Sequence, residues 1–306
     1  RIMEVCGTHT HEIFRLGIRK LLPEQVELIS GPGCPVCVTQ VGFIDEAIYL
    51  ALERQVTICT FGDLVRVPGT NMSLAGAREK GAKIRIVYSP VDAKEYAKEH
   101  PKEQVTFLSV GFETTTPSAC LSVKKAREEG LTNYSILTAN KTMPQAYEAL
   151  KGSADIFLYP GHVNAITGTK LCEELAKEGV SGVVAGFTAK ELLTALAVAL
   201  ARFQEGRPFF VNCYPRVVTE NGSPQAQKLV EEMMEPCDSE WRGLGVIKGS
   251  GMRLQEEWSA FDARKKYKIP PIQGKANPAC RCGDVLQGKC KPSDCKVFVR
   301  SVHHSI

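Results

Sequence analysis

The stretch VTFLSVGFETTTPSACLSVKKAREEGLTNYSILT, residues 105–138, sets the expected fold of this chain. It starts with a continuous apolar run at 105–110, crosses a Thr-rich loop, continues with a helical pattern at 117–129 and ends in a second apolar run at 134–138. A buried strand, a helix and another buried strand in this order are typical of a parallel βαβ unit. The stretch therefore predicts an α/β protein.

The same alternation runs through most of the chain. Other apolar, β-rich runs and helical patterns lie at residues 1–5, 26–29, 42–53, 56–60, 84–88, 144–151, 155–159, 182–185 and 188–203. The charged segment 92–104 and the segment 208–224 are the best boundaries between sets of strands and helices. We therefore predict α/β domains at residues 1–95 and 96–215, and a small Cys-rich C-terminal domain at residues 216–306.

Composition limits the classes of partner. The 306 residues are 43% hydrophobic and 24% charged, as in ordinary globular proteins, and the net charge of +4 is spread along the chain. Only residues 264–268 form a basic run, so a nucleic-acid partner is not expected. No apolar run is long enough to cross a bilayer and no leader opens the chain, which predicts a soluble, cytoplasmic protein. Because the chain opens on a strand at Arg1, we expect that its natural start lies upstream.

Twelve cysteines are many for a cytosolic chain, in which clustered thiols indicate metal or redox chemistry. Five are isolated and are predicted to be small buried hydrophobes: Cys59, Cys120, Cys172, Cys213 and Cys237. The other seven are grouped as Cys6, the pair Cys34 and Cys37, and the tail set Cys280, Cys282, Cys290 and Cys295.

Polar or cysteine-bearing loops follow five of the expected strands, at residues 6–11, 31–37, 61–63, 111–114 and 160–162. In open α/β sheets, ligands bind at the carboxyl ends of the strands. We therefore expect the functional side chains to lie on these edges.

The sequence Gly-Pro-Gly-Cys-Pro-Val-Cys at residues 31–37 places Cys34 and Cys37 in a CxxC turn. This spacing allows the two thiols to close a disulfide, and a helix starting near residue 40 would lower a thiol pKa. Redox or iron chemistry is the favoured interpretation. Half of a zinc site, or an inert pair, is the alternative.

Cys6 stands in a Gly-Thr-rich loop with His9, Thr10 and His11. A thiolate binds iron, and a neighbouring imidazole can accept the thiol proton or act as a ligand. A cysteine of this kind is more often structural, but its expected place on the same sheet edge as Cys34 would bring soft sulfur donors together. Cys6, His9 and Thr10 are therefore candidate cofactor-binding residues, with Cys6 as a metal ligand.

Glu113 and His162 are the acid–base candidates of the second domain. For both side chains a structural role is as plausible as a chemical one. The threonines after Glu113 and the residue Asp63 are also expected at helix starts, where they would cap. Asp63 is retained as a further candidate in cofactor binding.

The tail places Cys280, Cys282, Cys290 and Cys295 within sixteen positions. Such a set suggests a metal or an iron–sulfur cluster, although its spacing matches none of the ferredoxin patterns, and zinc or uncoordinated thiols are alternatives. The chain has no Gly-x-Gly-x-x-Gly after its first strand and no Walker A lysine, so a nucleotide site has no support.

Taken together, five motifs resemble the HypD family of hydrogenase maturation proteins, in the family's order and over nearly the whole chain: residues 3–11, 31–39, 61–69, 111–117 and 160–163. The resemblance implies two Rossmann-like parallel-sheet domains and a small third domain with a [4Fe-4S] cluster. It also implies a function as the scaffold on which the Fe(CN)2CO group of [NiFe] hydrogenases is built.

The resemblance further implies partners. The chaperone HypC would share the iron with Cys6, and HypE would deliver cyanide as a thiocyanate that HypF makes from carbamoyl phosphate. Cys34 and Cys37 would be a thiol redox pair that supplies electrons for cyanide release, with Glu113 and His162 supplying protons or orienting the ligand.

The chain departs from the family pattern at its end, where residues 296–306 stand in place of a Pro-Leu-Phe run and several further cysteines. We therefore expect that some cluster ligands are missing. Two rival functions stay open. A freestanding thiol-disulfide oxidoreductase would use Cys34 and Cys37 without iron, and a small-molecule transferase would not need Cys6.

Overall fold

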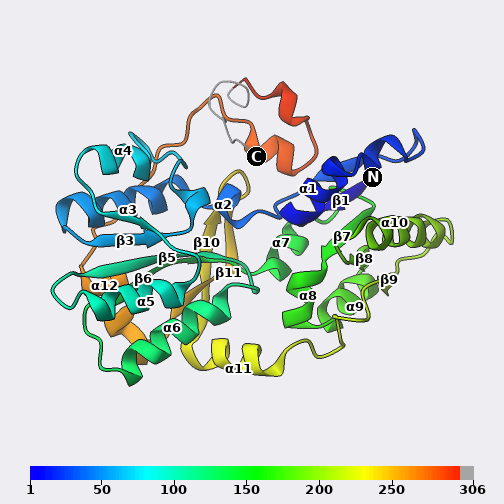
Figure 1. The fold of residues 1–306 in the computed structure, drawn as a ribbon. Helices are drawn as coiled ribbons and strands as arrows, with labels where there is room; N and C mark the ends of the chain where they lie inside the picture. Colours follow the sequence, from blue (N-terminus) through cyan, green and yellow to red (C-terminus); the bar gives the residue numbers. More distant parts are fainter. Residues whose placement is uncertain (297–306) are drawn as a thin grey trace. The chain divides into compact units, whose positions relative to one another are not determined.

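The computed structural model describes residues 1–296 of the chain (Figure 1). The described residues form two compact units, each built from segments that are distant in the sequence. Unit 1 contains Arg1–Cys34, Pro144–Gln227 and the segment that starts at Ala279, and unit 2 contains Pro35–Met143 and Lys228–Pro278. No helix within residues 1–296 has the length and apolarity to cross a membrane.

Unit 1 is built on a five-stranded parallel sheet of order β2-β1-β7-β8-β9. Its strands are β1 (Ile2–Glu4), β2 (Leu28–Ser30), β7 (Ile156–Pro160), β8 (Ser181–Ala185) and β9 (Phe210–Asn212). Its helices are α1 (Gly7–Arg15), α7 (Met143–Ala149, apart from its first residue), α8 (Gly161–Thr167), α9 (Lys170–Lys177), α10 (Ala189–Phe203) and α13 (Cys282–Leu286).

Helix α10 shows how the sequence builds this unit. Thr188 and Glu191 form a capping box that satisfies the first backbone N–H groups of the helix. Leu192, Ala195, Leu196 and Ala199 then recur at helical spacing and are buried. They pack with residues of α1, β1, β7 and β8 in one apolar cluster, so α10 and α1 share a face of the sheet.

Unit 2 is built on a four-stranded parallel sheet of order β4-β3-β5-β6. Its strands are β3 (Thr57–Thr60), β4 (Ile84–Ile86), β5 (Val105–Gly111) and β6 (Tyr134–Asn140). Its helices are α2 (Pro35–Val38), α3 (Val41–Glu53), α4 (Leu74–Glu79), α5 (Pro90–Glu99), α6 (Thr116–Glu128) and α12 (Ala263–Lys266).

The side chains of β5 alternate between two cores, as the period of a strand requires. Val105 and Phe107 pack with residues of α5 and α6, whereas Leu108 and Val110 pack with residues of α3 and α4. Helices therefore cover both faces of the sheet, and Figure 1 shows α3 and α4 on the face opposite α5 and α6. Each unit is thus a Rossmann-like parallel layer.

A long antiparallel ribbon, β10 (Met234–Trp241) with β11 (Gly245–Leu254), joins unit 2 after helix α11 (Pro224–Met233), which spans the division between the units. Lys141 directly follows β6 and is fully buried. Its Nζ anchors the ribbon to the sheet by donating to Ser239 Oγ at 2.6 Å and to the Glu240 carbonyl at 2.7 Å. The Trp241 ring stacks on Phe112 at 5.8 Å between centroids.

The predicted α/β class with two parallel layers is confirmed, and every expected strand and helix is present within a few residues of its predicted bounds. The predicted domain bounds, 1–95, 96–215 and 216–306, differ from the two units. Strand β1 pairs with β7, and α5 lies inside unit 2 rather than at a boundary. Periodicity identifies strands but not their partners, which in a parallel sheet are distant in the chain.

The C-terminal segment 216–306 also differs from the expected loop-rich module. Residues 228–278 belong to unit 2, where Trp258 and Phe261 pack in its core, and the segment from Ala279 belongs to unit 1. The glycines and prolines of this segment predicted turns, yet the alternating burial of β10 is that of an antiparallel strand covered on one face. Residues 297–306, which include most of the unusual tail, lie outside the described residues.

Two leucines of unit 2 test the core assignment. Leu50 of α3 is fully buried, whereas Leu121 of α6 is 38% exposed. We expect Leu50→Ala to lower the free energy of unfolding by about 2–5 kcal/mol, because it leaves a cavity, and Leu121→Ala to lower it by less than about 1 kcal/mol. Urea unfolding followed by circular dichroism measures both. Equal losses for the two variants would contradict the assigned core.

Candidate functional site

In unit 1 the segments that carry Cys6 and Cys34 lie against each other at the carboxyl ends of β1 and β2. The Gly7 N–H donates to the Gly33 carbonyl at 2.9 Å, and a Cβ on Gly7 would lie 3.5 Å from Cys34 Cβ. A Cβ on Gly33 would lie 2.2 Å from Cys6 N, so only glycine fits there. The structure thus brings two of the three motif cysteines together in one unit.

Cys6 is the N-cap residue of α1 and is 8% exposed. Burial raises the pKa of its thiol, and the backbone N–H groups of His9 and Thr8 act in the opposite direction. The thiol is therefore protonated at neutral pH. A bound metal ion would favour the thiolate form.

Thr10 has a structural contact in this turn. Its hydroxyl donates to the Cys6 carbonyl at 3.3 Å, one turn earlier in the helix. Beneath the turn, the fully buried Glu4 accepts a hydrogen bond from Arg19 at 2.6 Å, a pair that sequence reasoning did not single out. The Thr10 contact lies within the first turn of α1, whereas the Glu4–Arg19 pair joins the end of β1 to the 3-10 helix Ile18–Lys20.

His9 is fully buried one turn after Cys6. Its Nε2 lies 3.0 Å from the Gly186 carbonyl, and since a carbonyl only accepts, Nε2 carries the proton. Burial lowers the pKa of His9 to about 4, so the ring is neutral. Its Nδ1 is an acceptor that is buried and has no partner among residues 1–296.

His162 follows β7 on the same sheet edge, and its side chain is exposed. Its ring stacks on Phe187 with 3.8 Å between centroids and 20° between planes, while the ring of His9 lies 4.7 Å from the same Phe187. Desolvation lowers the pKa of His162. The structure therefore places His9 and His162 against one phenyl ring. Sequence reasoning missed Phe187, although its place directly after the strand β8 was a usable signal.

In unit 2 Glu113 and Asp63 follow β5 and β3 on the carboxyl edge of the sheet. Glu113 Oε1 accepts from the Met143 N–H at 2.8 Å, whereas its Oε2 is buried with no partner in the described part of the chain. Burial raises the pKa of Glu113 to about 7, so the carboxyl is partly protonated at neutral pH. Asp63 is exposed in the first turn of the 3-10 helix Gly62–Leu64.

The CxxC motif is divided between the units, since unit 1 ends its first segment at Cys34 and unit 2 starts at Pro35. Residues Pro35–Val38 form the short helix α2, so Cys37 lies in a helix and not in the expected turn. Cys37 is exposed and Cys34 is half-buried.

Unit 1 includes the tail cysteines. The sulfur atoms of Cys280 and Cys282 lie 3.0 Å apart at the start of α13, and Cys295 is buried. No three His, Cys, Asp or Glu side chains of residues 1–296 are arranged to hold a metal ion. The residues as described therefore do not form a cluster-binding set. The [4Fe-4S] ligands Cys280, Cys282, Cys290 and Cys295 stay a prediction.

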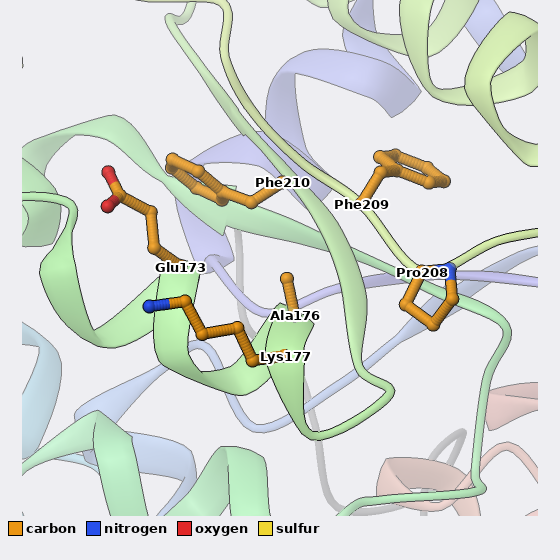
Figure 2. A pocket seen from close by; sticks show the side chains of 6 residues that line it. All are labelled: Glu173, Ala176, Lys177, Pro208, Phe209 and Phe210. Atoms are coloured by element: carbon orange, nitrogen blue, oxygen red, sulfur yellow. The ribbon is translucent and has the colours of Figure 1, made fainter.

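Two other features lie apart from this chemistry. Burial raises the pKa of the isolated thiols Cys59, Cys120 and Cys172 to about 12, as expected of small buried side chains, while Cys213 and Cys237 are only partly buried. A pocket of about 480 Å³ lies between α9 and the start of β9, and Figure 2 shows the side chains that line it, Glu173, Ala176, Lys177, Pro208, Phe209 and Phe210. No thiol or imidazole lines this pocket.

Comparison with known proteins identifies close relatives. The family model named HypD, described as the hydrogenase formation hypA family, matches residues 1–304. The hydrogenase maturation factor HypD of Escherichia coli is 42% identical to the chain over 97% of the chain and 82% of its own length. The proteins of the same name from Rhizobium leguminosarum and Cupriavidus necator are 42% and 40% identical over 97% of the chain and 80% and 82% of their own lengths.

Gly33→Ala tests the contact between the two cysteine segments. The added methyl group would meet the Cys6 backbone, which cannot move aside as a flexible side chain could. We expect the free energy of unfolding to fall by about 1–3 kcal/mol. Gly7→Ala is the matched control, because its Cβ would have ordinary contacts of 3.4 Å or more, and should change stability by less than about 1 kcal/mol. Thermal melts that rank the two variants in the reverse order would contradict the contact.

The raised pKa of Glu113 predicts that the free energy of unfolding depends on pH. Its pKa is raised from 4.5 to about 7 in the folded chain, so its stabilising effect is complete below pH 4.5 and is lost as the pH rises through 7. Relative to Glu113→Gln, the wild type should therefore lose up to about 3 kcal/mol of unfolding free energy between pH 4.5 and 8. Urea titrations of both proteins at several pH values measure this difference. Parallel pH curves would show that the carboxyl is not perturbed.

Proposed function

Because the chain belongs to the HypD family of hydrogenase maturation factors, we propose that it is the scaffold on which the Fe(CN)2CO group is assembled, with iron as its cargo. In this proposal Cys6 is the protein's iron ligand. The chaperone HypC shares the iron, and HypE delivers cyanide as a thiocyanate. The assembly takes place in the cytoplasm.

The single observation that carries the proposal is the placement of Cys6. Its thiol stands at the start of α1, against backbone N–H groups, and the Gly33–Cys34 segment packs on the Cys6 backbone. Sulfur donors suit low-valent iron, and iron binding releases the proton that burial otherwise keeps on the thiol. The neutral His9, whose buried Nδ1 has no partner among residues 1–296, is proposed as a further cofactor-binding residue.

Cys34 and Cys37 are proposed as the redox pair. Cleaving the S–C bond of a protein thiocyanate consumes two electrons and two protons, and gives a thiol and hydrogen cyanide. A dithiol that closes to a disulfide supplies both electrons and both protons. The CxxC spacing allows the two thiols to close a disulfide, and the exposure of Cys37 favours its attack on an incoming substrate.

Glu113 and His162 are proposed to handle protons. Hydrogen cyanide must lose its proton before it binds iron as cyanide, and this step needs a base close to neutral pH. The exposed, neutral imidazole of His162 fits that role. Glu113, with a pKa of about 7, fits the role of passing one of the dithiol protons to the leaving sulfur. Asp63 and Thr10 are retained as candidate binding residues without an assigned step.

Infrared spectroscopy tests the scaffold. We would purify the chain anaerobically with HypC and record the cyanide and carbonyl stretching region together with total iron. Wild type should show metal-bound CN and CO bands, and Cys6→Ala should lose them with most of the iron. Cys213→Ala is the matched control, because Cys213 is a partly buried cysteine of the same unit that lies outside the motifs.

Two results would count against the proposal. Bands of full strength in Cys6→Ala would exclude Cys6 as the iron ligand. A wild type without iron or bands, but with disulfide reduction that depends on Cys34 and Cys37, would favour the freestanding thiol-disulfide oxidoreductase.

A further inference from the structure

A layer of three rings stands at the carboxyl edge of the unit 1 sheet. His162, which follows β7, and His9, in α1, each lie against the ring of Phe187, which follows β8. The contact with His162 is the closer one, with 3.8 Å between centroids and nearly parallel planes. The two rings are therefore stacked nearly face to face, and this close contact restricts the orientation of each ring.

We propose that Phe187 is a positioning residue that holds the imidazole of His162 in one orientation for proton transfer. This inference rests on the proposed role of His162. Phe187 itself has no group that could exchange a proton, so it acts through the ring that it supports.

Hydrogen bonds to Glu191 hold the loop that carries Phe187. The N–H of Phe187 donates to Glu191 Oε2 at 2.9 Å, and Thr188 N–H donates to the same oxygen at 3.0 Å. Glu191 also pairs with Arg216 at 2.8 Å, and the Arg216 guanidinium lies 4.9 Å from the ring of Tyr214. Tyr214 in turn meets Phe187 edge-on at 6.2 Å. These contacts hold the phenyl ring of Phe187 in a defined position, and the ring can therefore orient the imidazole stacked on it.

The other side of the layer is equally constrained. His9 is fully buried, and its Nε2 is bonded to the carbonyl of Gly186, the residue before Phe187. A Cβ on Gly186 would lie 2.3 Å from the Glu191 carboxylate and 2.7 Å from the Tyr214 ring, so this approach requires glycine. His162 is the exposed member of the layer, because one face of its ring is covered by Phe187 while the side chain still reaches solvent. The stack on Phe187 restricts χ2 of His162.

Nuclear magnetic resonance reads the orientation directly. The chain has six histidines, and a His162→Gln spectrum identifies the ring protons of His162 by their absence. In wild type these protons should be shifted upfield by the ring current of Phe187. Phe187→Leu should remove the shift, and Phe187→Tyr, which keeps the ring, should retain it.

The chemistry gives the second readout. In the infrared assay described above, Phe187→Leu should slow the accumulation of CN bands by roughly tenfold or more, because a small misplacement of a catalytic group is costly. Phe187→Tyr should restore the wild-type rate. Phe210→Leu is the matched control, because it removes a partly buried phenyl ring of the same unit that contacts neither histidine.

The inference is overturned if the His162 resonances of Phe187→Leu stay at their wild-type positions, or if Phe210→Leu slows the bands as much as Phe187→Leu does. If wild type forms no bands at all, the proposed function fails, and the resonance measurement alone decides whether Phe187 orients His162.

Discussion

The pairing of β1 with β7 is the constraint on which unit 1 depends, because it joins Ile2–Glu4 to residues 154 positions further along the chain. With β2 on the other side of β1 and β8 next to β7, it aligns the carboxyl ends of four strands. The segments that follow the ends of β1, β2, β7 and β8 contain Cys6, Cys34, His162 and Phe187, respectively. A parallel sheet makes this alignment unavoidable once the strand order is set.

The aligned side chains share one electrostatic property: burial favours their uncharged forms. It raises the pKa of the Cys6 thiol and lowers the pKa of His9 and His162. Charged forms would lose hydration without gaining a partner. Uncharged side chains of this kind are compatible with the iron binding and proton transfer proposed above, because metal binding displaces a thiol proton.

In unit 2 a polar contact joins the parallel sheet to the β10–β11 ribbon. Lys141 is fully buried, and burial lowers its pKa to about 8, yet two hydrogen bonds to the β10–β11 ribbon satisfy its ammonium group. The same ribbon pairs with Thr39 through Trp241, and its Arg242 N–H donates to the Val38 carbonyl at 2.8 Å. The ribbon therefore links the carboxyl edge of the sheet to the short helix that contains Cys37.

The sequence by itself determined the strands, the helices and the motif residues, because apolar periodicity, caps and spacing are local properties. It also placed Cys6, Cys34 and His162 after strands, as the structure has them. The domain bounds, the antiparallel ribbon and the ring layer around Phe187 were decided only by the tertiary structure. Strand partners, the packing of Gly33 on Cys6 and the stack of Phe187 on His162 join residues that are distant in the chain, and no local pattern records which of them meet.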